Sequence, residues 1–153
     1  MYERILVPVD GSDASHAGLN EALALAAEHQ SRIRLLHIVD DLITIPIYEG
    51  AVFAGELIDQ LRQQGRRLLD ECAALCKKKG IAVETVLLER VGGQAGTLII
   101  EQAQDWPAEL IVMGTHGRRG LKRIVLGSDA EYVIRHAGIP VLLVRAPSEL
   151  GAR

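Results

Sequence analysis

The sequence predicts an α/β protein with an open parallel sheet sandwiched between helices. Short apolar runs alternate with longer helical stretches along the whole chain, and this alternation favours a parallel sheet with helices on both faces. The connections carry glycine, proline, aspartate and serine, which are typical of turns. Because the chain has 153 residues, we expect one domain over residues 1–146, followed by a loose tail over residues 147–153.

The first apolar run, Arg4–Val9, is expected to be the first strand. Pro8 lacks an amide hydrogen and therefore belongs at the end of that strand. The segment Asp10–Asp13 carries turn residues, and its serine or its second aspartate can cap a helix. That helix is predicted over Ala14–His29.

The second strand is expected over Arg32–Val39, with His37 inside it. A single histidine in a strand is usually packed and hydrogen-bonded, which we expect here in preference to a catalytic role. The irregular stretch Asp40–Gly55 is long enough to be a lid or a partner loop, or else it is a plain connection.

A long amphipathic helix is predicted over Ala54–Lys79, because its leucines recur near the helical period. Lysines in its last turn suit the helix dipole, and Gly80 is a natural helix stop. Cys72 and Cys76 have i, i+4 spacing and therefore share one face of this helix. No further ligands stand at zinc-type spacing, so we expect two buried thiols in a reducing compartment.

The second half of the chain continues the alternation of strands and helices. The predicted elements are a strand over Ile81–Leu88, a helix over Gln94–Gln104 ended by Trp106 and Pro107, a strand over Glu109–Met113, a helix over Asp129–His136 and a last strand over Val141–Val144. With the two earlier strands, the predicted sheet is five-stranded.

Composition excludes several classes of function. Hydrophobic residues make up 48% of the chain and charged residues 24%, which is ordinary for a globular domain. Aromatic residues are only 3%, so base stacking is not expected, and the net charge of -3 disfavours general nucleic-acid binding. No signal peptide is visible and no apolar run could span a membrane, so we expect a cytoplasmic protein.

The segment from Gly114 to Ser128 carries the strongest signal for a ligand. It follows a buried apolar strand, contains four cationic side chains within residues 118–123, and ends on Gly127–Ser128 just before a helix. Backbone amides near Gly117, Gly127 and Ser128 can approach a phosphate, because glycine has no side chain and a helix start has N–H groups outside its own ladder.

These residues also have purely structural interpretations. Ser128 and Glu131 fit a capping box at the start of the last helix. Gly114 and Gly117 fit a tight exit from the strand, and His116 fits a solvent-exposed loop residue. Both interpretations stay open from the residues alone.

Asp10 stands at the carboxyl end of the first predicted strand, which is the edge where ligands bind in open α/β sheets. Its carboxylate can accept hydrogen bonds from ribose hydroxyls, or it can simply stabilise the turn. Val39, at the end of the second strand, could pair with an adenine edge through its backbone.

The spacing Gly114-x-x-Gly117, nine residues, then Gly127-Ser128 resembles the nucleotide-binding signature of the universal stress protein family. The opening residues 5–12, Ile-Leu-Val-Pro-Val-Asp-Gly-Ser, and the closing residues 140–144, Pro-Val-Leu-Leu-Val, extend the resemblance over nearly the whole chain. The resemblance implies a Rossmann-like sheet of order 3-2-1-4-5 with helices on both faces. It also implies a homodimer that pairs the strand Val141–Val144 antiparallel across a two-fold axis.

In nucleotide-binding members of that family, the matching positions line an ATP site. The resemblance therefore implies ATP, ADP or AMP as ligand, with Mg²⁺ bound through the phosphates. We predict no metal-ligating residue and no catalytic residue in the chain. Asp129 departs from the family pattern, and its carboxylate is expected to lie close to the triphosphate. The implied site residues are Pro8, Val9, Asp10, Val39, Met113, Gly114, His116, Gly117, Gly127 and Ser128, with Asp129 beside them.

The function predicted in this way is that of an adenine-nucleotide-binding regulatory or stress-response protein, acting as a homodimer on a partner that the sequence does not identify. One alternative is a slow ATP hydrolase at the same site, for which His116 is the only candidate base. The other is a dimeric interaction protein with a vestigial site. Motifs of P-loop ATPases, dinucleotide dehydrogenases and α/β-hydrolases do not occur in the sequence.

Overall fold

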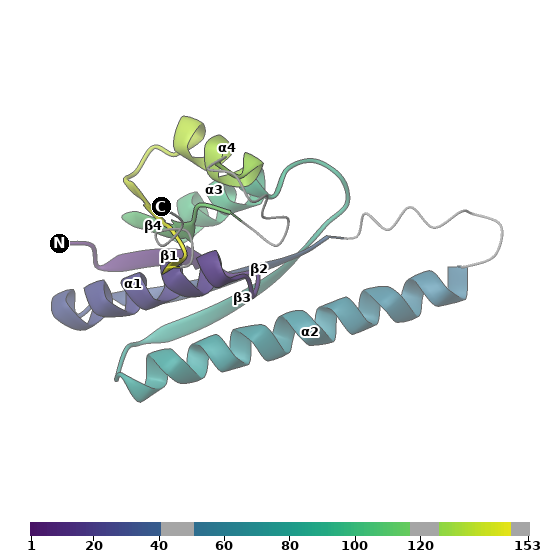
Figure 1. Ribbon diagram of the computed structural model, residues 1–153, viewed down its shortest axis with the longest axis horizontal. Helices are drawn as coiled ribbons and strands as arrows, with labels where there is room; N and C mark the ends of the chain where they lie inside the picture. The colour runs from purple at the N-terminus through teal and green to yellow at the C-terminus, as the bar shows by residue number, and fades with distance from the viewer. Residues whose placement is uncertain (41–50, 117–125, 148–153) are drawn as a thin grey trace.

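The five strands that the structure describes form one parallel sheet, as the sequence predicted, and they have the spatial order 3-2-1-4-5 that the resemblance implied. The computed structural model describes residues 1–40, 51–116 and 126–147, and of residues 51–54 only the backbone. The chain alternates strands and helices throughout (Figure 1). The elements are β1 (Arg4–Pro8), α1 (Asp13–His29), β2 (Arg32–Asp40), α2 (Ala51–Lys78), β3 (Val83–Arg90), α3 (Ala95–Asp105), β4 (Leu110–Gly114), α4 (Ser128–His136) and β5 (Val141–Val144).

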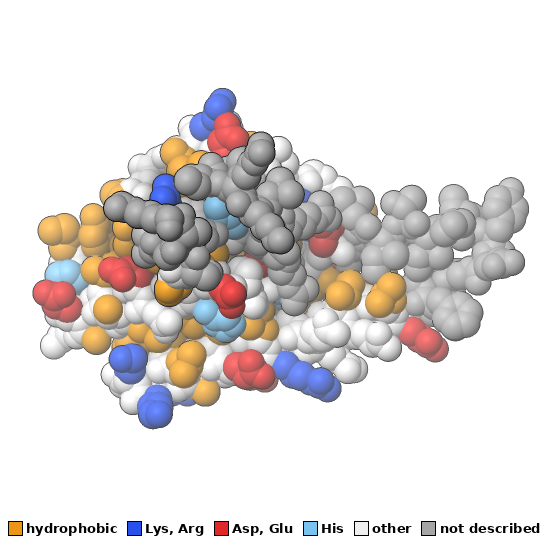
Figure 2. All heavy atoms as spheres, viewed as in Figure 1, with side chains coloured by type: hydrophobic (Ala, Val, Ile, Leu, Met, Phe, Trp, Pro, Cys, Tyr) orange, Lys and Arg blue, Asp and Glu red, His pale blue; other side chains and the backbone are white. Residues whose placement is uncertain are grey.

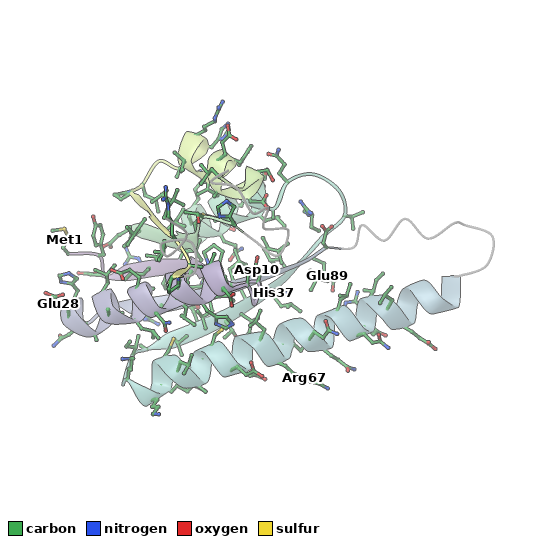
Figure 3. All side chains as sticks on the ribbon, in the orientation of Figure 1. Met1, Asp10, Glu28, His37, Arg67 and Glu89 are labelled. Atoms are coloured by element: carbon green, nitrogen blue, oxygen red, sulfur yellow. The ribbon has the colours of Figure 1, made fainter. Side chains whose placement is uncertain are left out.

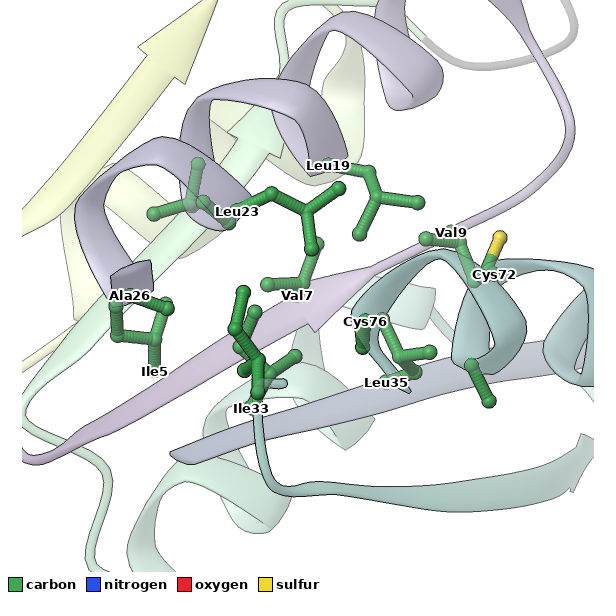
Figure 4. Close-up of a cluster of buried hydrophobic side chains, with 14 of the residues drawn as sticks. Ile5, Val7, Val9, Leu19, Leu23, Ala26, Ile33, Leu35, Cys72 and Cys76 are labelled. Atoms are coloured by element: carbon green, nitrogen blue, oxygen red, sulfur yellow. The ribbon is translucent and has the colours of Figure 1, made fainter. Parts of the chain in front are cut away.

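Helices α1 and α2 cover one face of the sheet, and α3 and α4 cover the other (Figure 1). On the first face, Ile5 and Val7 of β1 pack against Leu19 and Leu23 of α1, as Figure 4 shows. Residues of both α3 and α4 pack against Leu6 and its neighbours on the second face. A parallel sheet covered in this way has strands that are apolar on both sides, which explains the short continuous apolar runs in the sequence.

The two cysteines are buried in the cluster between α2 and the sheet, as expected (Figure 4). Cys72 is 1% exposed and Cys76 is 0% exposed. Burial raises the pKa of both thiols to about 11, because an apolar environment disfavours the thiolate. These side chains therefore contribute to the core as small apolar groups.

The end of α2 shows why β3 begins later than the sequence predicted. Gly80 has a φ of 71° and closes the helix, as expected, in a left-handed cap. In that cap Ile81 donates its N–H to the carbonyl of Cys76 at 3.0 Å. The N–H of Ile81 is therefore used by the helix end, and the strand begins at Val83 instead of Ile81.

Other element boundaries differ from the predictions by one to three residues. β1 ends at Pro8 instead of Val9, β2 and β4 run on to Asp40 and Gly114, and α2 begins at Ala51 instead of Ala54. Residues 41–50, which hold most of the predicted lid or partner loop, and residues 148–153 of the predicted tail lie outside the described residues.

Helix α2 is the longest element, and its outer surface carries charges of both signs. Figure 2 shows Lys and Arg side chains interspersed with Asp and Glu along the lower edge of the molecule, where α2 lies in Figure 1. Within the part of the chain that the structure describes, no helix is both long enough and apolar enough to cross a bilayer.

Candidate functional site

The strand order reverses between β1 and β4, and both strands leave the sheet at the same edge. Ligands of open α/β sheets bind at this edge, where successive connections leave for opposite faces. The predicted site residues in the last positions of β1, β2 and β4, or directly after these strands, lie here, whereas Gly117 lies outside the described residues. Asp10 and His37 mark this edge in Figure 3.

The turn after β1 is held by three hydrogen bonds that involve Asp10, Ser12 and Ser15. The Oδ1 atom of Asp10 accepts the N–H of Ser12 at 2.9 Å, and the N–H of Asp10 donates to the Oγ of Ser15 at 3.2 Å. Ser12 caps α1 by accepting the N–H of Ser15, as predicted. The turn interpretation of Asp10 is therefore confirmed, and the same bonds fix the direction of its carboxylate at the sheet edge.

His37 supports this turn from below, on the side of the sheet that α2 covers. Its Nδ1 lies 2.7 Å from the carbonyl oxygen of Val9, and because a carbonyl only accepts, Nδ1 carries the hydrogen. The side chain is 7% exposed, so the expectation of a packed, hydrogen-bonded histidine is confirmed. The sequence did not show that its partner is the residue next to Asp10.

Three of the predicted site residues have buried side chains. Val9 is 4% exposed, Val39 is 3% exposed and Met113 is 7% exposed. The N–H of Val9 is also engaged, since it donates to the carbonyl of Leu36 at 2.8 Å. These residues can therefore shape the site through the backbone, while their side chains belong to the core.

Gly114 is required by the packing of α1 on β4. A Cβ atom at this position would lie 2.5 Å from the carbonyl carbon of Ala14 and 2.6 Å from its oxygen. Gly18 of α1 faces the same point, because a Cβ there would lie 3.2 Å from the nitrogen of Gly114. The backbone that approaches Gly114 closely is that of α1, in agreement with the structural interpretation of this glycine.

The start of α4 differs from the prediction in two details. Gly127 is the N-cap residue and Ser128 the first helical residue, so the predicted capping box of Ser128 and Glu131 is wrong. Glu131 is one position too late for that motif, and its carboxylate pairs instead with Arg135 at 2.7 Å. The N–H of Gly127 is also not open to a phosphate, because it donates to the carbonyl of Thr115 at 2.9 Å.

The anion-binding capacity at this helix start therefore resides in the next three amides. The helical ladder begins with the N–H of Glu131, which donates to the carbonyl of Gly127 at 2.9 Å. The N–H groups of residues 128–130 precede that ladder and point along the helix axis toward the sheet edge. Gly127 offers no side chain to cap them.

Asp129 has a different partner from the one that the sequence suggested. Its Oδ1 atom accepts the N–H of Gly96 in the first turn of α3, at 3.1 Å. The carboxylate is thus directed to the neighbouring helix, whereas it was expected to lie close to the triphosphate. The partner is 33 residues away in sequence, which explains why the chain alone did not reveal it.

His116 is half-buried and not a solvent-exposed loop residue. A hydrogen bond of 3.0 Å joins its Nδ1 to the Oγ1 of Thr115, which is itself buried. The N–H of Thr115 donates to the carbonyl of Val144 at 3.0 Å and so ties this exit from β4 to β5. The imidazole is therefore held by the side chain of Thr115, whose own backbone is tied to β5.

An ion pair on the rim beside Val39 was not found from the sequence. Asp40 at the end of β2 pairs with Arg90 at the end of β3, and the two residues are opposite each other in the strand register. The Nη1 of Arg90 also donates to the carbonyl of Gly93 at 2.8 Å. The pair depends on the register of two strands, and it links the end of β2 to the connection that precedes α3.

Metal ligands of the protein itself were not predicted. Within residues 1–40, 51–116 and 126–147, no group of three or more His, Cys, Asp and Glu side chains is placed to hold a metal ion.

The fold and the helix start at its sheet edge define the class of the protein: an open α/β domain with the topology of nucleotide-binding proteins. The sequence pattern of the universal stress protein family matches residues 1–145. This match spans nearly the whole chain, and the chain therefore belongs to the universal stress protein family.

Relatives and solved structures agree with this assignment. The chain is 36% identical to the universal stress protein MJ0531 of Methanocaldococcus jannaschii over 97% of this chain and 85% of that protein. A crystal structure from the same family in Burkholderia pseudomallei is 35% identical, with a TM-score of 0.76 over 94% of this chain and 96% of that one. A universal stress protein from Archaeoglobus fulgidus, solved in complex with dAMP, is 26% identical, with a TM-score of 0.68 over 94% and 98% of the two chains.

Proposed function

We propose that this universal stress protein binds an adenine nucleotide at the carboxyl ends of β1 and β4 and acts as a dimeric regulator in a stress response. The start of α4 carries the proposal, because three amides precede its ladder and no N-cap side chain covers them. The dAMP complex of the relative from Archaeoglobus fulgidus supports adenine nucleotides as the ligand class.

The proposed contacts follow from the geometry of each element. The amides of residues 128–130 bind phosphate oxygens, and the hydroxyl of Ser128 is exposed beside them. Asp10 accepts hydrogen bonds from ribose hydroxyls, because its turn fixes the carboxylate at the carboxyl edge of β1. Val39 presents only its backbone to the base, since its side chain is buried. Mg²⁺ would be held through the phosphates of ATP or ADP.

The proposed dimer uses the edge strand β5. It is the last strand of the sheet order, and all four of its residues are partly exposed. An apolar edge strand with a free side is suited to pairing with a second chain. We propose that two copies pair their β5 strands antiparallel.

The sharpest test of the nucleotide site removes one amide without disturbing the helix. Proline is favoured at the first helical position, and Gly127 has φ -60° and ψ 147°, a conformation that suits the residue before proline. Ser128→Pro should therefore leave α4 intact while deleting its first amide donor. A hydrogen bond to a charged group contributes about 1.5–3 kcal/mol, so ATP affinity should fall by about 10- to 150-fold.

The chain offers a matched control for this substitution. Asp13 is the first residue of α1, and Ser12 before it has φ -73° and ψ 160°, so Asp13→Pro makes the same change at another helix start. Asp13→Pro should leave ATP affinity near that of the wild type. Ser128→Ala removes the hydroxyl but keeps the amide, so it shows how much of the effect of Ser128→Pro comes from the hydroxyl. Titration calorimetry with ATP, ADP and AMP in magnesium buffer measures all four proteins. A wild type that binds none of these nucleotides would disprove the proposed function.

A further inference from the structure

The start of α4 is joined to the start of α3 by two contacts. The carboxylate of Asp129 accepts the N–H of Gly96 at 3.1 Å. Tyr132, one turn further along α4, lies over the same glycine, since a Cβ at Gly96 would be 2.7 Å from its Cδ1 and 3.0 Å from its Cβ. The absence of a side chain at Gly96 thus lets the first turns of the two helices meet.

Asp129 replaces a cap that α3 does not have in its own sequence. The N-cap residue of α3 is Gln94, whose side chain makes no capping hydrogen bond. Asp129 supplies an acceptor to the second residue of that helix, and its negative charge lies at the positive end of the α3 dipole. The carboxylate is therefore directed toward the start of α3, and the positive end of that helix dipole partly offsets its charge.

The same bond fixes the amides of residues 128–130. One residue before them, Gly127 is tied to the exit of β4 through the carbonyl of Thr115 at 2.9 Å. In their midst, Asp129 is tied to α3. These two points on different elements determine the direction in which the first turn of α4 presents its N–H groups.

We propose that Asp129 is a positioning residue for phosphate binding: its hydrogen bond to Gly96 holds the first turn of α4 in the direction that a phosphate requires. This inference rests on the proposed nucleotide site. It reverses the sign expected from simple repulsion between a carboxylate and a triphosphate, because removing Asp129 should weaken the binding of phosphorylated ligands. The acceptor oxygen matters in this account, and the charge does not.

Two substitutions at Asp129 separate these accounts. Asp129→Asn keeps an oxygen acceptor and removes the charge, whereas Asp129→Ala removes both. Loss of one hydrogen bond that orients the amides should weaken ADP by about 3- to 10-fold in Asp129→Ala, while Asp129→Asn stays within about twofold of the wild type. Adenosine, which has no phosphate, should bind both variants as it binds the wild type.

A matched control removes a neighbouring charge without touching α3. Glu131 is the other acidic residue in the first turn of α4, and it pairs with Arg135 on its own helix. Glu131→Ala should leave ADP affinity unchanged. Hydrogen exchange gives a readout without ligand: the amide of Gly96 should lose protection in Asp129→Ala and keep it in Asp129→Asn. If Asp129→Ala does not fold, Asp129→Ser is measured in its place with the same expected order.

The outcomes distinguish the two hypotheses. A wild type that binds neither ADP nor adenosine overturns the proposed function and this inference with it. If the wild type binds ADP, three results overturn the inference alone. The first is that Asp129→Ala binds ADP as tightly as the wild type or more tightly. The others are that Asp129→Asn loses as much ADP affinity as Asp129→Ala, or that the affinity for adenosine falls as much as the affinity for ADP.

Discussion

Gly114 illustrates how a residue from a ligand-binding signature can be required by packing. Its neighbour at the shortest distance is the backbone of Ala14, which cannot move without displacing the first turn of α1. That turn begins directly after the loop that carries Asp10. A side chain at residue 114 would therefore disturb the fold and the proposed ribose contact together.

We predict that Gly114→Ala destabilises the protein by about 1–3 kcal/mol, the usual cost of overpacking a core. A Cβ at residue 114 would be 2.5 Å from a backbone carbon, so a backbone shift is needed. Gly138→Ala is the control, because a Cβ there meets no atom within 4 Å. Urea unfolding measures both variants. Equal midpoints for the two would contradict the packing account of Gly114.

The buried thiols predict a specific dependence of stability on pH. Their pKa rises from the model-compound value of 9.0 to about 11 in the folded protein, so above pH 9 the unfolded chain releases protons that the folded chain retains. The free energy of unfolding should therefore fall between about pH 9 and 11 and should be unaffected by the thiols below that range. A double variant, Cys72→Ala with Cys76→Ala, should lose this part of the decline.

Urea unfolding of the wild type and of the double variant at about pH 8, 9, 10 and 10.5 measures the free energy of unfolding below the predicted window and within it. Other groups that titrate in this range affect both proteins equally, so the difference between the two curves isolates the thiols.

The same burial should make both thiols of the native protein unreactive toward a thiol reagent at about pH 8. Rapid labelling before unfolding would contradict their place in the core.

At the residue scale, the sequence predicted where several of the proposed site residues lie in the fold, but not the hydrogen bonds that they make. Residues next to strand ends, such as Asp10, were predictable because the fold places every strand end of a parallel sheet at one edge. The partner of His37 and the partner of Asp129 were not predictable, because each lies on another element. Such contacts depend on helix packing and on strand register, which local patterns do not encode.

The close packing of α2 on the sheet depends on Gly65. A Cβ at this position would lie 2.6 Å from Cδ2 of His37 and 2.7 Å from Cδ1 of Leu87. His37 has little freedom to give way, because its ring is bonded to the carbonyl of Val9. The position of α2 is therefore linked, through one imidazole, to the backbone beside Asp10.

We predict that Gly65→Ala destabilises the protein by about 1–3 kcal/mol, in spite of the higher helix propensity of alanine. Gly55→Ala is a control in the same helix, where a Cβ meets no atom within 4 Å and alanine should stabilise by about 0.5–1 kcal/mol. Thermal unfolding measures the opposite signs. The amide resonances of Asp10 and Ser12 should move in Gly65→Ala alone. Stabilisation by both substitutions would show that His37 is not held as described.

At the element scale, the order and kind of the elements were predictable, and their ends were less so. Apolar runs and the helical period identify buried strands and amphipathic helices directly. The ends depend on the hydrogen-bond partners of the backbone groups. The N–H of Ile81 is bonded within the cap of α2, and Gly127, not Ser128, is the N-cap residue of α4. The first of these ends is decided by a hydrogen bond within the cap of α2, and the second accompanies a hydrogen bond from Gly127 to Thr115 across a loop.

The strand order is a property of the whole molecule that the alternation of elements does not determine. Alternation predicts a parallel sheet, and several orders satisfy it. The order β3-β2-β1-β4-β5 was implied by the family resemblance, and the structure confirms it. That order places β1 beside β4 and leaves β5 at one edge, so both the proposed nucleotide site and the proposed dimer follow from it.

Strand β5 is an edge strand in the part of the chain that the structure describes, and it gives the last prediction, a homodimer in solution. Leu142 and Val144 pack toward α1, while Val141 and Leu143 pack on the opposite face, and all four are only partly buried in the single chain. Pairing with a second β5 would satisfy the outer backbone groups and cover apolar side chains on both faces. Sedimentation equilibrium should therefore report a dimer.

Charged substitutions on the two faces of β5 test this pairing. Leu142→Glu and Leu143→Glu should each shift the molecule toward the monomer, because a charge would be buried without a partner in the dimer. Each side chain also contacts the core of its own chain, so circular dichroism must show that the variant remains folded. Leu75→Glu is the control, since Leu75 is 44% exposed and lies on α2, which packs on β2 and β3 at the other end of the sheet order from β5. It should leave the dimer intact. A wild type that sediments as a monomer at high concentration would rule out the pairing, and loss of the dimer in Leu75→Glu would place the interface elsewhere.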